Sequence, residues 1–354
     1  MAQALRLREP FSDAVDSAML PRVIDLGGGL YGAAFTLMKL LPARFILRRA
    51  AERGELEPGT TVIETTSGTF GLGLAMVCRL SGNPLILVGD PAIDRALRRR
   101  LEELGARVSI VSGRALDNGG VQQARLDRVA RLQRRHRSFF TPGQYDNPLN
   151  PVSYGIVAEL LAESLGAIDT LVCPVGSGGS SSGIASFLRL VWPELRLVAV
   201  DTPGSVLFGA PPGPRPLRGL GSGIIPKVLD HTLFDEVHWV GASHAFAATR
   251  RLHMTHSLYG GPTSGAAYLV ARWWVSRNPG ARVLALMPDE GHRYQSTVYD
   301  DRWLRRHGLT ATEPLAGPVD IDHPGQVVPP WTHLRWGRRS RWQVTGSAEG
   351  VHRP

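Results

Sequence analysis

Short apolar runs alternate with amphipathic segments along most of this chain. Most of the runs are continuously apolar, which is typical of parallel strands covered on both faces. The predicted strands are Thr61–Thr65, Leu85–Val88, Arg107–Val111, Thr170–Val175, Arg196–Val200 and Arg282–Met287. The predicted helices are Arg44–Gly54, Gly71–Leu80, Ala92–Leu104, Val121–Arg135, Gly155–Leu165, Gly183–Val191, Ser243–His256 and Ser264–Arg277. This alternation predicts an α/β protein with right-handed crossovers.

The pattern stops near Gly308. Residues 308–354 are rich in Pro, Gly, Arg and Trp and show no clear periodicity, so we predict a largely irregular tail. Trp331, Trp336 and Trp342 suggest that part of this tail docks on a surface, for which a partner subunit is one candidate.

Length and composition restrict the class of protein. A chain of 354 residues with 43% hydrophobic content suits two globular domains. The net charge of +9 comes from arginines spread over several helices, so we do not expect nucleic-acid binding as the main role. Cys78 and Cys173 lie in apolar runs and are predicted to be buried thiols. We find neither a secretory signal nor an apolar run of the ~18 residues that a membrane span needs, and we expect a cytoplasmic protein.

The chain contains only two lysines, Lys39 and Lys227, against 38 arginines. A retained lysine indicates a need for an amine, because an amine can lose its proton and attack a carbonyl whereas a guanidinium stays charged. Lys39 lies in an apolar stretch that would lower its pKa. It is either a Schiff-base lysine or a lysine at a helix start whose amine reaches water.

Two loops follow predicted strands and open predicted helices. Gly176-Ser177-Gly178-Gly179-Ser180 combines flexible backbone with a helix start, which suits a phosphate. Thr66-Ser67-Gly68-Thr69 offers hydroxyl and N–H groups at a helix start, which suits a carboxylate but is also an ordinary helix cap. An amine, a phosphate loop and a carboxylate loop together point to pyridoxal 5′-phosphate acting on an amino acid.

With these features the chain resembles the cysteine synthase and cystathionine β-synthase family of fold type II pyridoxal-phosphate enzymes. The resemblance covers about residues 20–304. It rests on motifs that occur in the family's order: Lys39 with the segment Arg49–Leu56, Thr66–Gly68, Gln144–Pro151, Gly176–Ser180, Gly219–Lys227, Pro262–Ala267 and Pro288–Tyr294. Lys227 matches a non-catalytic position, which leaves Lys39 as the catalytic amine.

The resemblance implies both the fold and the roles of individual residues. The fold would be tryptophan synthase β-like, with open, twisted, mostly parallel sheets and helices on both faces. Residues 1–42 and 145–307 would form a large cofactor-binding domain, and residues 43–144 a small mobile domain. The cofactor would be held by Lys39, Thr69, Gly176, Ser177, Gly178, Gly179, Ser180 and Glu290. The substrate would be held by Thr66, Ser67, Gly68, Gln144, Arg218 and Gly219. We predict no metal site.

Three of these positions depart from the family pattern or extend it. Thr69 stands where the family has an asparagine. Glu290 stands where the family usually places a serine opposite the pyridine nitrogen, and a carboxylate there would favour the protonated ring. Alternatively, the loop is shifted by one residue, so that Glu290 points to solvent or pairs with Arg293. Arg218 matches a position at which members that use O-phosphoserine carry arginine, although it could also be a surface residue.

The implied activity is β-replacement on O-acetylserine or O-phosphoserine through an aminoacrylate, giving cysteine or a nonstandard β-substituted alanine. Two alternatives stay open. One is β-elimination, deamination or racemisation of a small amino acid. The other is a catalytically degenerate relative that acts as a binding protein. The family expectation for assembly is a homodimer.

Overall fold

The computed structural model describes residues 10–91, 93–111, 120–217, 219–310 and 317–346. The strands are β1 (Arg22–Gly27), β2 (Leu30–Ala34), β3 (Thr61–Thr65), β4 (Leu85–Gly89), β5 (Ala106–Ile110), β6 (Phe139–Phe140), β7 (Thr170–Pro174), β8 (Arg196–Asp201), β9 (Glu236–Val240), β10 (Val283–Met287), β11 (Val319–Asp320) and β12 (Trp331–Arg335). The helices are α1 (Leu40–Glu52), α2 (Thr69–Ser81), α3 (Arg95–Glu103), α4 (Gly120–Gln133), α5 (Leu149–Val152), α6 (Gly155–Leu165), α7 (Gly179–Leu188), α8 (Ala242–His256), α9 (Pro262–Arg277), α10 (Asp301–Arg306) and α11 (Arg341–Thr345).

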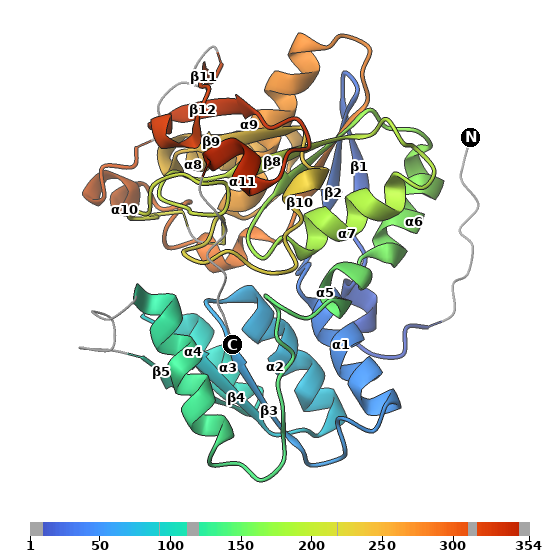
Figure 1. The fold of residues 1–354 in the computed structure, drawn as a ribbon, viewed down its shortest axis with the longest axis vertical. Coiled ribbons are helices and arrows are strands. Elements are labelled where there is room, and N and C mark those ends of the chain that lie inside the picture. The colour runs from blue at the N-terminus through green and yellow to red at the C-terminus, as the bar shows by residue number, and fades with distance from the viewer. Residues whose placement is uncertain (1–9, 92, 112–119, 218, 311–316, 347–354) are drawn as a thin grey trace.

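The strands form two sheets, which Figure 1 shows as separate bodies with the smaller one at the bottom. The larger sheet has the order β1-β2-β10-β7-β8-β9-β12-β11, and its strands from β2 to β9 are parallel. The smaller sheet has the order β5-β4-β3-β6 and is parallel throughout. The expectation of mostly parallel sheets in an α/β fold is confirmed.

Helices cover both faces of the larger sheet. Alternate residues of β7 point to opposite faces, so Leu171 and Cys173 enter one core and Val172 enters the other. The first core lies under α6 and α7, and the second lies under α8 and α9. Burial on both sides explains why these strands read as continuous apolar runs. Both cysteines are free and buried, as expected from their apolar surroundings, and burial raises the pKa of each thiol.

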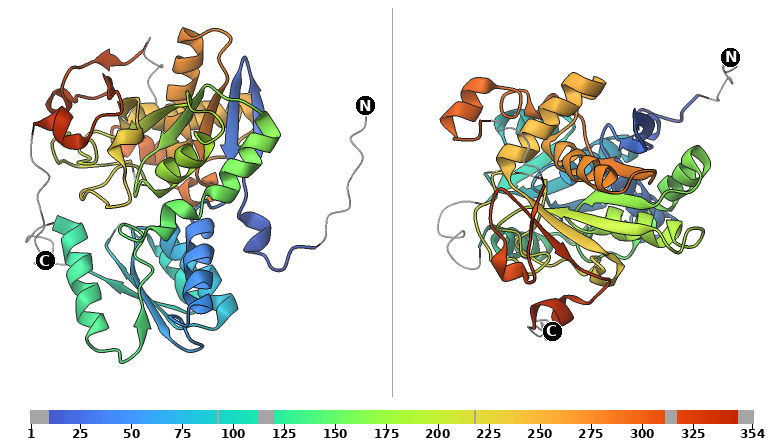
Figure 2. Two further views of the ribbon diagram at one scale, coloured as in Figure 1. Left: turned by 45° about the vertical axis from the view of Figure 1, so that its right-hand side comes forward. Right: turned by 90° about the horizontal axis from the view of Figure 1, so that it is seen from above.

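The end of the chain is more regular than its sequence suggested. Residues 317–346, here called the C-terminal segment, include β12, which pairs antiparallel with β9 and extends the larger sheet. Figure 2 shows this segment, in red, beside the larger sheet. Trp331 and Trp336 are buried in the chain's own cores, whereas Trp342 is exposed. The prediction of an irregular tail is therefore wrong for these residues, because a five-residue strand is too short to show a period.

Strands β1, β2 and β9 were also missed by the sequence analysis. Strand β9 interleaves Glu236 and His238 with apolar residues, yet all its positions are buried. Polar residues at buried strand positions give a pattern that periodicity alone cannot recognise. Among the helices described, none is both long enough and apolar enough to cross a membrane.

Candidate active site

A cavity of about 470 Å³ lies between loops of the two sheets. Its lining residues follow the ends of strands: Thr66 comes after β3, Asp90 after β4, Gly176 after β7 and Asp289 after β10. Ligands of open α/β sheets bind outside the carboxyl ends of parallel strands. The cavity is therefore the candidate active site.

Lys39 immediately precedes α1 and lines this cavity. Its Nζ donates a hydrogen bond to Ser177 Oγ at 3.1 Å. The flanking residues Met38 and Leu40 are buried and apolar, and burial lowers the pKa of the Lys39 amine to about 8. A sizeable neutral fraction of the amine is then present near neutral pH, which suits a nucleophile or a base.

The glycine–serine loop joins β7 to α7. Gly178 has a φ of +84°, and a Cβ at this position would lie 2.8 Å from Leu229 Cβ, so the backbone there requires glycine. Because α7 begins at Gly179, the N–H groups of its first turn lack partners within the helix and favour an anion. Three residues of the loop line the cavity: Gly176, Ser177 and Ser180. Gly178 and Gly179, which were also predicted to hold the cofactor, are not among the lining residues, and the role of the loop as a phosphate site stays a prediction.

The loop after β3 is shaped by its own hydrogen bonds. Thr66 Oγ1 accepts hydrogen bonds from the backbone N–H groups of Gly68 and Gly71, each at 3.0 Å. The Thr66 hydroxyl therefore holds the loop in place. Ser67 is exposed and lines the cavity, and Thr69 lines it as the first residue of α2. The structure thus brings these four predicted residues to the cavity wall, with Ser67 the most accessible hydroxyl.

Gln144 is held beside the same loop by buried contacts. Its side-chain Nε2 donates to the backbone carbonyl oxygen of Thr65 at 3.2 Å. The backbone carbonyl oxygen of Gln144 accepts from Asn150 Nδ2 at 2.6 Å. The backbone N–H groups of Gly143 and Gln144 donate to the Glu64 carboxylate at 2.7 and 3.4 Å. Burial raises the pKa of Glu64 to about 7, while these donors favour its ionised form. The side chain of Gln144 is thereby fixed at the cavity wall.

Three arginines that the sequence analysis did not select also line the cavity: Arg125, Arg215 and Arg293. Arg125 on α4 is buried, and its Nη1 lies 3.1 Å from Asp90 Oδ2. Burial lowers the pKa of Arg215, and the buried Asp201 carboxyl partly offsets this effect. In a chain with 38 arginines, the sequence contains no local signal that separates these three from surface residues.

Glu290 does not take the place predicted for it. Its Oε1 accepts hydrogen bonds from Arg22 Nη2 at 3.3 Å and from Thr36 Oγ1 at 3.4 Å, and the residue does not line the cavity. Asp289, one residue earlier, lines the cavity and accepts from the Tyr294 hydroxyl at 2.8 Å. The loop therefore presents the preceding acid, and Glu290 pairs with Arg22 rather than with Arg293.

The predicted closure segment approaches α4 across the cavity. Arg218 lies outside the described residues, whereas Gly219 lines the cavity with a φ of +83°. Gln122 on α4 donates from Nε2 to Ser222 Oγ at 3.2 Å, and its Oε1 accepts from the backbone N–H of Gly223 at 2.8 Å. These two bonds join a helix of the smaller sheet to a loop of the larger one.

The family model described as "Pyridoxal-phosphate dependent enzyme" matches residues 38–289. The chain belongs to this family. Its match begins one residue before Lys39 and ends at Asp289, so it contains every residue that lines the cavity except Arg293 and Tyr294. The expected cofactor class is thereby confirmed.

Two named relatives show which enzymes of this family the chain is similar to. It is 38% identical over 271 residues to the N-(2-amino-2-carboxyethyl)-L-glutamate synthase of Cupriavidus metallidurans, covering 75% of this chain and 79% of that protein. It is 32% identical over 257 residues to the cysteine synthase of Staphylococcus aureus, covering 71% of this chain and 81% of that protein. The expected relationship to cysteine synthases is confirmed.

A solved structure agrees with the fold. The O-acetylserine-dependent cystathionine β-synthase of Helicobacter pylori superposes with a TM-score of 0.74 at 26% sequence identity. The alignment covers 82% of this chain and 99% of that one. The fold type II architecture predicted from the motifs is thus confirmed.

The residues around the cavity fit pyridoxal phosphate. Gly176, Ser177 and Ser180 line the cavity at the start of α7, where backbone N–H and hydroxyl groups form a cradle suited to the phosphate. Lys39 offers an amine with a lowered pKa beside that cradle, 3.1 Å from Ser177. Asp289 adds a buried carboxyl whose Oδ1 has no hydrogen-bond partner among the described residues. These are the three kinds of group that the cofactor's phosphate, aldehyde and ring nitrogen require.

Proposed function

We propose that the protein catalyses β-replacement on an O-activated L-serine and forms a nonstandard β-substituted alanine. The observation that carries this proposal is the buried Lys39 amine in hydrogen-bond contact with Ser177 of the glycine–serine loop, inside one cavity. When bound, pyridoxal phosphate supplies an electron sink for negative charge at the substrate Cα. The relatives support replacement, because they are named as synthases of β-substituted amino acids.

The chain's own residues divide the work in this proposal. Lys39 would bind the cofactor aldehyde covalently and, once released by the substrate, would take the Cα proton through an amine whose pKa of about 8 suits a base. The loop Gly176–Ser180 and Thr69 would hold the cofactor. Ser67 and Gln144 would orient the α-carboxylate of the substrate, with Thr66 and Gly68 shaping that loop. Gly219 would take part in closing the site, and Arg218 before it is proposed to bind the substrate.

Three arginines give the cavity a positively charged wall, which indicates that one substrate carries an acid group besides its α-carboxylate. Arg125, Arg215 and Arg293 face a cavity in which Asp90 and Asp289 are the acidic residues of the lining. The buried Nη1 of Arg215 lacks a hydrogen-bond partner within the described chain. A guanidinium binds carboxylates and phosphates through paired N–H groups. An amine nucleophile with acid groups, such as the L-glutamate in the product named for the Cupriavidus relative, fits this wall better than sulfide does.

Product analysis tests the proposed reaction. Purified holoenzyme is given O-phosphoserine or O-acetylserine, each with L-glutamate, with sulfide or with no nucleophile. We expect a product that joins the serine Cβ to the glutamate nitrogen, detected by mass spectrometry. Pyruvate and ammonia released at full rate without a nucleophile would instead establish elimination and reject the proposal.

Replacing Arg125 by Lys keeps the charge opposite Asp90 but removes the planar fork. Losing a hydrogen bond to a charged group costs about 1.5–3 kcal/mol, so we expect kcat/KM for the acidic substrate to fall roughly 10- to 100-fold. The loss should be small for a pair of neutral substrates. Steady-state kinetics with each donor and nucleophile measures both.

Arg128→Lys is the matched control, because Arg128 lies on the same helix and its Nε donates to Ser109 at 3.2 Å. It should leave the kinetics unchanged. A loss confined to O-phosphoserine would place the acid group on the donor, and a loss confined to glutamate would place it on the nucleophile. Equal losses for neutral substrates would contradict an anion-binding role.

We also propose that residues 43–144 move as a unit over residues 1–42 and 145–307. The support is the pair of hydrogen bonds that Gln122 makes with Ser222 and Gly223, which span the cavity in this structure and would hold the two parts in the closed arrangement. Each such bond contributes about 0.5–1.5 kcal/mol, so Gln122→Ala should raise KM for the amino acid roughly tenfold, with little change in circular dichroism.

Gln123→Ala provides the comparison. The Gln123 side chain donates to Asp127 at 2.9 Å on the exposed side of the same helix. Loss of this hydrogen bond should leave KM unaltered. If KM in Gln122→Ala equals the wild-type value, the two bonds do not contribute to closure.

We further propose a cytoplasmic homodimer. Free buried cysteines suit a reducing compartment. Val152, Ile156, Phe187 and Leu190 expose apolar side chains on α5, on α6 and around the end of α7, which is consistent with a subunit contact.

A further inference from the structure

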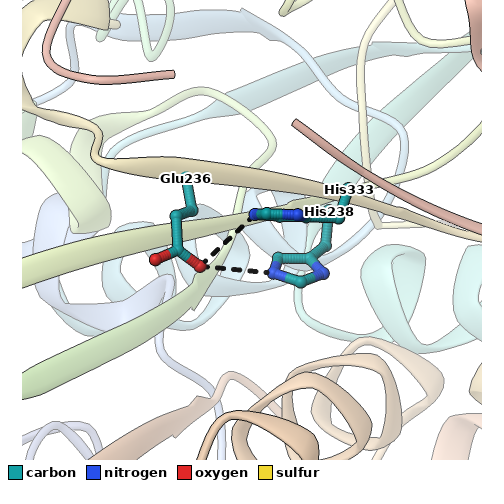
Figure 3. A group of neighbouring side chains, drawn as sticks. All are labelled: Glu236, His238 and His333. Atoms are coloured by element: carbon teal, nitrogen blue, oxygen red, sulfur yellow. Dashed lines mark ion pairs between the residues drawn. The ribbon is translucent and has the colours of Figure 1, made fainter. Parts of the chain in front are cut away.

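Three side chains with metal-binding groups converge on the larger sheet, away from the cavity. Glu236 and His238 lie on β9, and His333 lies directly opposite His238 on β12. Because Glu236 precedes His238 by two residues, all three share one face of the sheet. Figure 3 shows the carboxylate and the two imidazole rings turned toward one another. None of the three lines the cavity.

The distances between the donor atoms suit a common ion. Glu236 Oε2 lies 3.5 Å from His333 Nε2 and 3.7 Å from His238 Nε2, and all three donor atoms lie within 4.8 Å of one another. Two ligands that each bind zinc at 2.0–2.2 Å in tetrahedral geometry are about 3.4 Å apart. A small inward movement of the side chains would therefore place the three donor atoms at three corners of a tetrahedron around one ion.

His333 and Glu236 each contact a further charged residue through the atom that faces away from the cluster, which leaves one atom of each facing the proposed ion. Asp320 Oδ1 lies 2.7 Å from His333 Nδ1, so Nδ1 donates to this carboxylate and Nε2, which faces Glu236, is the nitrogen that a metal ion would take in exchange for a proton. Arg196 Nη2 donates to Glu236 Oε1 at 2.8 Å, which leaves Oε2 facing the histidines. A carboxylate behind a coordinating histidine is a common feature of zinc sites, because it fixes the tautomer and raises ligand basicity.

The histidine nitrogens at the centre lack other partners. Nε2 of His238 and Nε2 of His333 are both buried and make no hydrogen bond within the described part of the chain. His238 is fully buried. A buried polar atom without a partner is costly, and a bound cation would satisfy both nitrogens.

We propose that Glu236, His238 and His333 bind one divalent transition-metal ion, with zinc the ion best suited to two imidazoles and a carboxylate. A water molecule would complete four-fold coordination. The ion would fasten β12, and with it the C-terminal segment, to β9. The proposed role rests on this bridging of two strands away from Lys39, and the water position would leave the ion one exchangeable ligand.

One contact opposes the ion and has to be overcome. Trp331 Nε1 donates to His238 Nδ1 at 3.2 Å, so in the ion-free state the His238 proton sits on Nε2. Metal binding at Nε2 moves that proton to Nδ1 and costs the indole its hydrogen bond. Binding of a structural zinc ion releases more free energy than one such bond contributes.

Metal titration of the full-length holoenzyme tests the proposal. After dialysis against a chelator, the protein is titrated with Zn²⁺ and separately with Co²⁺. We expect one ion per chain by elemental analysis, visible Co²⁺ absorption typical of four-coordinate sites, and a thermal midpoint that rises with Zn²⁺. Combined His238→Ala and His333→Ala substitution should abolish stoichiometric binding.

Asp320→Asn gives a milder test that does not depend on the folding of the double variant. Loss of a carboxylate behind a metal-bound histidine weakens affinity about 10- to 100-fold. Asp322→Asn, two residues along and outside the cluster, should bind like the wild type. Less than one ion per chain in saturating Zn²⁺, or equal affinity in the two aspartate variants, would overturn the site and leave an ion-free network joining His333 to Asp320 and Glu236.

Discussion

Lys39→Ala is expected to remove the yellow colour of the purified protein and to lower turnover by about 10³-fold or more. Alanine has no amine to bind the cofactor aldehyde or to take the Cα proton. Ser177, the hydrogen-bond partner of Lys39, cannot replace either role, because a hydroxyl is a much weaker base than an amine with a pKa of about 8. The measurements are the visible spectrum and steady-state rates with the donor and nucleophile that the product analysis selects.

The other lysine supplies a control within the same chain. Lys227 is exposed, and Lys227→Ala should keep both colour and rate. Borohydride reduction of the wild type followed by peptide mapping should place the reduced adduct on the peptide that contains residue 39. An adduct elsewhere, or a coloured and active Lys39→Ala protein, would show that the assignment of the amine is incorrect.

Gly178→Ala is expected to weaken cofactor binding by up to about a thousandfold. A left-handed backbone costs a residue with a side chain about 1–2 kcal/mol, and overpacking against Leu229 adds about 1–3 kcal/mol. The loop can relieve this strain only by moving, and movement separates the N–H groups at the start of α7. Titration of the apoenzyme with pyridoxal phosphate, followed by fluorescence, gives the affinity.

Gly176→Ala is the matched control in the same loop. A Cβ there would meet only the carbonyl oxygen of Gly219, at 3.7 Å, which is an ordinary contact. Its cofactor affinity should stay within a few-fold of the wild type. If both variants bind the cofactor equally well, the left-handed turn at Gly178 is not what shapes the phosphate site.

Local chemistry made part of the site predictable. Lys39 could be found because lysine is rare in this sequence and its neighbours are apolar, and both properties are visible without a structure. The loop at Gly176–Ser180 could be found because glycine and serine directly follow an apolar strand. Their contact, from Nζ to Ser177 Oγ, depends on β2 and β7 lying on either side of β10 in one sheet, which periodicity does not specify.

Side-chain direction was less predictable than position. Glu290 and Asp289 are adjacent acids, and successive residues in extended backbone point to opposite sides. The bridge between Gly260 and Glu290 fixes which of them turns toward the cavity. Arg125 and Arg215 illustrate the same limit, since only tertiary folding separates them from the many surface arginines.

The sequence by itself determined the α/β class and the family, and it singled out Lys39 and the glycine–serine loop as candidates for the amine and the phosphate site, because each depends on short runs of residues whose chemistry is local. The tertiary structure alone decided which acid faces the cavity, which arginines form its positive wall, and that His333 lies beside Glu236 and His238. These outcomes depend on strand order and register, which bring together residues that are far apart along the chain.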